Sequence, residues 1–314
     1  MTVAPAGGPA TGAPGSPATG AAGSPATTGA AGIPAASTAT GGSRVGGRRP
    51  ALVYALVVLV GAGSFLYPFW LPARALPAQA HAGDAPLVGA VVAALAVTAM
   101  VLEVRRGTMN GATVALLGVL GASAGLLRLL DLPGGGSGVF FLVVLAGAAF
   151  GPRFGLLLGF TAMATSAVLT GGIGPWLPFQ MLALAWLGAG AGLVGRLTVR
   201  ARPRVEVAVL AAYGWMWGFL YGAILNLWFW PFVRNGGPLD WEPGLGLAAT
   251  LRRYWSFYVV TSAGWDAAGA LANAALVAAT GAALLPAMRR FAVRLEPVTE
   301  FGDHVSTEGG WQQD

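Results

Sequence analysis

The chain has 314 residues, of which 55% are hydrophobic and only 10% are charged. Soluble domains carry about 25% charged residues, so this composition excludes an ordinary soluble domain and indicates a membrane protein. The formal net charge is +6, every basic residue is arginine, and cysteine is absent, which excludes thiol chemistry, disulfides and cysteine-ligated metals. The arginines flank apolar segments instead of forming a patch with interleaved aromatics, so no nucleic-acid partner is expected.

Residues 1–43 consist almost entirely of Gly, Ala, Pro, Ser and Thr, with GSPAT repeated at 15–19 and 23–27. Such a segment buries too little apolar surface to offset its ordering entropy, so it is predicted to be a disordered tail. It also lacks the charged start and apolar core of a cleavable signal peptide.

The rest of the chain predicts an all-α, polytopic bundle, because membrane spans need about 20 mostly apolar residues. We place eight spans, with an uncertainty of one or two because Gly151-Pro152-Arg153 separates a short fourth span from the fifth. Those two segments could form a tight helical hairpin or a broken, re-entrant pair. The spans lie at about 51–71, 86–103, 111–130, 138–152, 154–171, 175–195, 205–231 and 255–286.

The distribution of arginine sets the expected orientation, because cytoplasmic loops are enriched in basic residues. With the N-terminus inside, 13 of the 18 arginines lie in the cytoplasm and 5 lie outside. Eight spans then leave both termini cytoplasmic in the cell membrane. Loops 131–137, 171–175 and 232–254 face outward.

Polar side chains recur at one depth of this bundle. Counting 1.5 Å per residue along each span brings Gln180, Asn226 and Asp266 to a similar height near the outer face, and Thr170 lies beside them. Polar groups at such depths are costly in lipid and usually face a cavity or the bundle interior. A solute-binding pocket that opens outward is therefore expected, although interhelical hydrogen bonds alone are an alternative reading.

Asp266, Gly269 and Asn273 are spaced so that they share one helix face. A stripe of this composition should face the bundle, where the carboxylate of Asp266 could pair with Arg128, Arg252 or a ligand group. Arg128 and Asp131 could instead form a simple interfacial ion pair.

Tryptophans gather at the same predicted outer face, among them Trp176, Trp230 and Trp265. An aromatic belt explains tryptophans at both interfaces, but the predicted inner face has few. The segment 171–180 also holds three glycines and two prolines, which predicts a non-helical backbone lining a cavity. We expect an aromatic-lined pocket whose substrate-binding residues are Thr170, Trp176, Gln180, Asn226, Trp230, Trp265 and Asp266.

The sequence gives little indication of a catalytic site or a metal site. His81 and His304 are the only histidines and both lie outside the apolar spans, so neither a metal site nor a histidine-based triad is expected. No carboxylate pair at a useful spacing and no Walker loop are present, and no cofactor is predicted.

The motifs Thr170-Gly-Gly-Ile-Gly-Pro-Trp-Leu-Pro-Phe-Gln-Met181, Asn226-Leu-Trp-Phe-Trp-Pro-Phe232 and Gly264-Trp-Asp266 resemble those of substrate-binding S components of energy-coupling-factor transporters, in their actinobacterial form. The resemblance covers about residues 111–290 and implies a six-helix core that captures a vitamin or similar nutrient. It leaves residues 44–110, with two additional N-terminal spans, and a cytoplasmic tail at 291–314 outside that core.

The resemblance further implies docking onto a transmembrane coupling subunit that is driven by two ATPase subunits. The contact would use small residues of the core's first helix, here Gly118, Ala122 and Gly125. Loops 131–137, 171–175 and 232–254 would form a lid over the pocket, and the broad aromatic surface makes a corrinoid one candidate ligand.

Two other classes of function stay open at this stage. One is an integral membrane enzyme acting on a lipid or prenyl substrate with Asp266 as acid or base. The other is a structural scaffold that binds only proteins.

Overall fold

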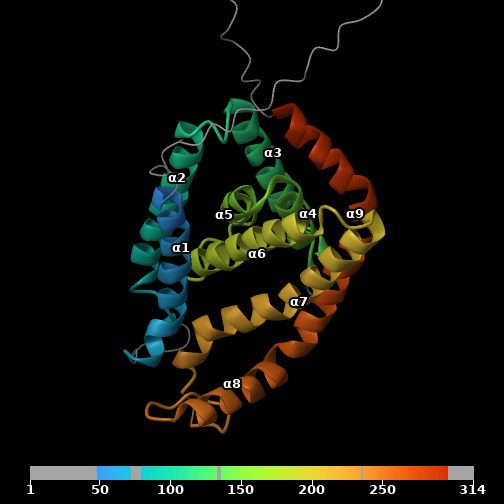
Figure 1. Ribbon diagram of the computed structural model, residues 1–314. Helices are drawn as coiled ribbons and strands as arrows, with labels where there is room; N and C mark the ends of the chain where they lie inside the picture. Colours follow the sequence, from blue (N-terminus) through green and yellow to red (C-terminus); the bar gives the residue numbers. More distant parts are fainter. Residues whose placement is uncertain (1–47, 72–78, 133–135, 235, 296–314) are drawn as a thin grey trace, which may run out of the picture. The chain divides into compact units, whose positions relative to one another are not determined.

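The computed structural model describes residues 48–71, 79–132, 136–234 and 236–295, and these residues belong to one compact unit (Figure 1). The predicted disordered tail at 1–43 and most of the predicted tail at 291–314 lie outside them, as does His304. The elements in chain order are α1 (Arg48–Leu66), η2 (Tyr67–Phe69), α2 (Ala85–Arg105), α3 (Gly111–Leu127), β1 (Asp131–Leu132), β2 (Gly136–Ser137), α4 (Val139–Phe150), α5 (Pro152–Thr170), α6 (Leu177–Thr198), α7 (Pro203–Phe229), η5 (Trp230–Phe232), α8 (Leu247–Thr261) and α9 (Ala263–Leu295).

The predicted all-helical fold is confirmed, apart from the two-residue antiparallel ribbon β1–β2. Within the described residues six helices are long and apolar enough to cross a membrane, namely α1, α2, α5, α6, α7 and α9. This is the architecture of a multi-pass membrane protein, but the predicted count of eight spans is not reached. The apolar helices α3 and α4 have only 17 and 12 residues.

The length of α4 explains its place in the fold. Twelve residues extend about 18 Å, well short of the roughly 30 Å of hydrocarbon. Most of its side chains are buried, because α5, α6 and α9 pack around it. Gly151 ends α4 with a φ of 95°, and Pro152 starts α5 at once, so the two helices form a tight hairpin.

Two predicted boundaries were wrong. The expected non-helical segment 171–180 ends earlier, because α6 begins at Leu177 and Pro178 occupies its first turn, where proline is tolerated. The expected span 255–286 is instead divided between α8 and α9, with the break at Ser262, whose φ is −131°. Helix α9 is therefore 33 residues long and starts at Ala263.

Glycines bring the central helices into backbone contact. A Cβ built on Gly188 of α6 would lie 2.1 Å from the carbonyl oxygen of Gly155 in α5, and the reverse contact has the same length. Gly159 and Gly192 extend this row, because a Cβ built on either would overlap the backbone of Ala185 or Pro152, respectively. Close approach through small residues is the usual basis of helix packing in membranes, where lipid gives little hydrophobic drive for association.

Buried carboxylates are paired at one end of the helices. Glu103 of α2 accepts hydrogen bonds from Tyr54 Oη at 2.9 Å and from Arg153 Nη1 at 3.2 Å. Glu206 of α7 binds Arg289 of α9, with the shorter contact at 2.5 Å. These ion pairs connect the start of α5 to α2 and α7 to α9, and they avoid unpaired buried charges.

At the opposite ends, a buried histidine joins the first two helices to the remaining ones. His81 precedes α2 and bonds Asp84 through Nδ1 at 2.7 Å and the carbonyl oxygen of Trp228 through Nε2 at 3.1 Å. Its ring also packs against Phe179 and Phe232. The sequence showed His81 only as a residue between apolar spans and gave no sign of this contact.

The glycine contact gives a matched stability test. Gly188→Ala is expected to destabilise the protein by about 1–3 kcal/mol, because the new methyl overlaps the Gly155 carbonyl. Gly118→Ala on α3 serves as the control, since its Cβ would meet nothing within 4 Å. Unfolding in detergent measures both variants, and equal stability of the two would contradict the packing argument.

Candidate binding site

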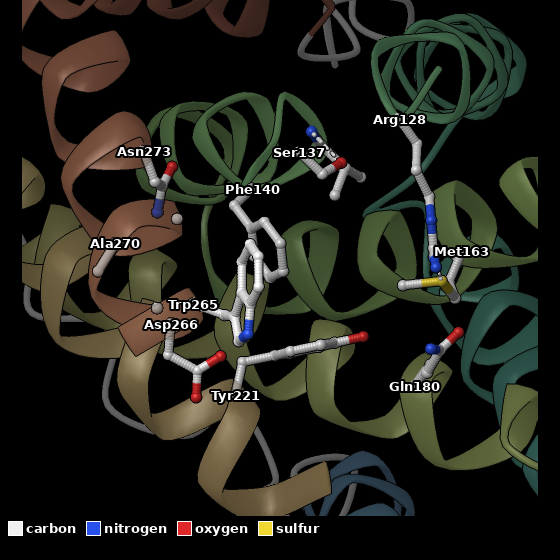
Figure 2. Close-up of a pocket in the computed structure, with 13 residues that line it drawn as sticks. Arg128, Ser137, Phe140, Met163, Gln180, Tyr221, Trp265, Asp266, Ala270 and Asn273 are labelled. Carbon is white, nitrogen blue, oxygen red and sulfur yellow. Dashed lines mark hydrogen bonds between the residues drawn. The ribbon is translucent and has the colours of Figure 1, made fainter. Parts of the chain in front are cut away.

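A cavity of about 440 Å³ is lined by residues of α4, α5, α6, α7 and α9 and by Arg128 at the end of α3. It lies away from the paired carboxylates of Glu103 and Glu206. This volume is within the usual range for small-molecule pockets. Figure 2 shows side chains from opposite sides of the bundle pointing into it. The lining residues are Arg128, Ser137, Val139, Phe140, Met163, Gln180, Gly218, Tyr221, Trp265, Asp266, Gly269, Ala270 and Asn273.

The wall formed by α7 and α9 depends on glycines that the sequence analysis did not single out. Gly214, Gly218 and Gly222 are spaced by four residues and therefore share one face of α7. A Cβ on Gly218 would lie 2.5 Å from Ala270, and one on Gly222 would lie 1.8 Å from the Oδ2 atom of Asp266. Their four-residue spacing was the available signal, since it is the small-residue pattern of close helix pairs.

The predicted stripe on α9 faces this cavity, because Asp266, Gly269 and Asn273 all line it. Asp266 lies in the first turn of α9, where the helix dipole stabilises a negative charge. Asn273 is 3% exposed and donates to the carbonyl oxygen of Gly214 at 2.9 Å.

Acceptor atoms on this stripe remain unsatisfied. Among the described residues, Asp266 Oδ2 and Asn273 Oδ1 are buried and have no hydrogen-bond partner. A buried acceptor without a partner costs about 1–3 kcal/mol, so it calls for an explanation. Both residues line the cavity, so a donor group within it is one way to satisfy these oxygens.

A positive charge occupies the other side of the cavity (Figure 2). Arg128 follows the last turn of α3, where the helix dipole favours a cation. Its Nη1 lies 2.7 Å from the sulfur of Met163, which is a weak acceptor. Among the described side chains no carboxylate pairs with Arg128. Gln180 lies on this side of the cavity and has no side-chain hydrogen bond to the described residues.

Aromatic rings lie between the two charged sides. Phe140 and Tyr221 pack edge to face, with ring centroids 4.9 Å apart and planes at 83°. Trp265 also lines the cavity while its side chain is 68% exposed, so it lies at the border between cavity and surroundings. Rings in these positions suit a planar ligand, which can stack on an aromatic face or make an edge-to-face contact.

The other predicted substrate-binding residues lie outside this lining. Thr170 bonds the carbonyl oxygen of Ser166 at 2.8 Å, and Trp176 stands at the start of α6 against Gly174. Asn226 donates to Ser262 at 2.7 Å, at the junction of α8 and α9.

Trp230 is fully buried in a separate aromatic cluster with Trp241 and Phe257. Its indole nitrogen donates to the carbonyl oxygen of Leu239 at 2.8 Å. These contacts hold the segment between α7 and α8 in place. Of the three expected lid loops, 131–137 contributes Ser137 to the cavity.

The predicted partner contact on α3 is divided between two faces. Gly118 and Ala122 are exposed, so they remain available to another helix. Gly125 is buried, because a Cβ there would lie 3.0 Å from the backbone nitrogen of Ser166 in α5.

The described residues contain no group of three or more His, Asp or Glu side chains that could hold a metal ion.

No known protein family, curated protein or solved structure matches this chain. What the geometry defines is a multi-pass helical membrane protein with a partly aromatic cavity that is lined by Arg128 on one side and Asp266 on the other.

The contacts of Trp230 generate a stability prediction. Trp230→Phe keeps a buried aromatic ring but leaves the carbonyl of Leu239 without its donor, which should cost about 1–3 kcal/mol of folding free energy. Thermal unfolding in detergent measures the change. A variant as stable as the wild type would show that the indole hydrogen bond contributes nothing.

Proposed function

We propose that this protein is the substrate-binding subunit of an energy-coupling-factor type transporter, capturing a vitamin or similar small nutrient for uptake. The observation that carries the proposal is the cavity itself, where Gln180, Asp266 and Asn273 from two helices meet Arg128 from a third. Binding sites in membrane proteins are typically built from such polar side chains facing a cavity within the bundle. The protein would bind its solute without converting it chemically.

The proposed topology keeps the eight crossings expected from the sequence. Six are the long helices, and the short helices α3 and α4 complete the count, with α4 shielded by protein. Irregular or short elements at membrane depth are tolerated when protein covers them. Both termini then lie in the cytoplasm, and the cavity opens at the outer face of the cell membrane.

The energy for uptake would come from partner proteins. The sequence has no Walker loop, so we propose a transmembrane coupling subunit with two ATPase subunits. The exposed residues Gly118 and Ala122 on α3 offer a small-residue face for that coupling subunit.

Capture of a solute from a mixture tests this function directly. Purified protein is incubated with a small-molecule filtrate of yeast extract, desalted and examined by native mass spectrometry. A stoichiometric non-lipid adduct is expected. Conversion of a lipid extract that is lost in Asp266→Asn would instead identify a membrane enzyme, and absence of any non-lipid adduct would contradict the proposal.

Asp266→Asn should weaken retention of the captured solute by about 1–3 kcal/mol, because the substitution removes the charge from the cavity and keeps the shape. Arg290→Gln is the matched control, since it changes an exposed charge on the same helix about 36 Å away. Titration of both folded variants with the solute identified from the filtrate measures the effect. Unchanged affinity in Asp266→Asn would remove this residue from the binding site.

The topology can be tested in this cysteine-free chain. Glu242→Cys, in the exposed connection before α8, should react with a membrane-impermeant maleimide in intact cells. Val199→Cys, exposed after α6, should react only after permeabilisation. The reverse labelling pattern would place the cavity on the inner side and would contradict capture from outside.

A further inference from the structure

We propose that the cavity selects a small, ring-containing solute that carries an anionic group at one end and a cationic or N–H-donating group at the other. The anionic group binds Arg128 and Gln180, and the donating group binds Asp266 and Asn273. This inference rests on the proposed function, because it assigns a ligand chemistry to the same cavity.

The argument for the anionic end begins with Arg128. A guanidinium group carries five N–H donors in a planar fork and binds carboxylate or phosphate groups in bidentate fashion. The sulfur of Met163 satisfies at most one of these donors, and only weakly. Among the described side chains none supplies the other acceptors or a countercharge, and a ligand carboxylate or phosphate would supply both. The amide of Gln180, on the same side of the cavity, can donate to the same group.

The argument for the donating end rests on two orphaned acceptors. Asp266 Oδ2 and Asn273 Oδ1 accept no hydrogen bond from the described residues, and both residues line the cavity. A carboxylate inside a bundle needs a cation or strong donors, because an uncompensated buried charge is costly. A protonated amine matches the carboxylate of Asp266, and a further N–H group of the solute matches Asn273 Oδ1.

The middle of the cavity defines the body of the solute. Phe140 and Tyr221 lie between the charged sides, and Trp265 borders the same space (Figure 2). The volume of about 440 Å³ lies near the lower end of the range for ligand pockets. This favours a compact molecule with one or two rings over a macrocycle such as a corrinoid, the candidate suggested by the aromatic surface alone.

The guanidinium group of Arg128 and the carboxyl group of Asp266 do not neutralise one another. Among the described side chains neither Arg128 nor Asp266 forms an ion pair. They come from different helices, and each stands at the helix end that stabilises its sign of charge. The cavity is therefore polarised, and a ligand with complementary ends compensates both charges in one step.

The test uses the yeast-extract filtrate and identifies the captured solute by tandem mass spectrometry. A ring compound bearing an anionic group and a cationic or N–H-donating group is expected. Arg128→Gln and Asp266→Asn should each weaken its capture by about tenfold or more, while Arg290→Gln leaves it unchanged. Capture of a solute that lacks either group would overturn the inference and leave the proposed function intact. No captured solute at all would instead overturn the proposed function.

A derivative of the captured solute with its anionic group esterified separates direct contact from a structural role. The wild-type protein should bind the ester about tenfold or more weakly than the parent compound, whereas Arg128→Gln should bind the two equally. An equal loss in both proteins would show that Arg128 does not meet the anionic group, and would overturn the charge assignment.

Discussion

The close contact between α5 and α6 is the constraint on which the rest of the structure depends. Gly155 and Gly188 place the backbones of these helices against each other, and any larger side chain would overlap a carbonyl group. Dispersion and close packing, more than hydrophobic burial, hold helices together in lipid, so this contact positions the central helices. The short helix α4 then fits against α5 and α6, and its first turn contributes Phe140 to the cavity.

A second constraint is electrostatic. Charged side chains inside a membrane bundle cost free energy unless they are paired. The charged side chains of this protein are paired at one end of the bundle but not at the cavity. At one end Glu103 and Glu206 are each paired with an arginine. At the cavity, Arg128 and Asp266 stay apart among the described side chains and are stabilised by the ends of their helices. This contrast separates charges that hold the fold from charges that are available to a ligand.

The sequence predicted part of the site because depth can be counted along a helix. The counts brought Gln180 and Asp266 to one level, and both line the cavity. They also brought Asn226 there, next to Thr170, but these two side chains bond Ser262 and Ser166 instead. A residue count gives height in the membrane and says little about which neighbour a side chain faces. The direction in which a side chain points follows from helix packing. Between α7 and α9 this packing depends on the glycines of α7.

Composition and the length of the apolar segments by themselves determined that this chain is a helical membrane protein, because lipid leaves the backbone no other way to satisfy its polar groups within a single segment. The spacing of Asp266, Gly269 and Asn273 likewise determined that they share a helix face. Only the tertiary structure decided that α4 is enclosed by its neighbours, that the helix breaks at Ser262, and that His81 is buried between separate helices. It also placed Arg128 across the cavity from Asp266, since contacts between distant segments arise from packing, which local sequence does not encode.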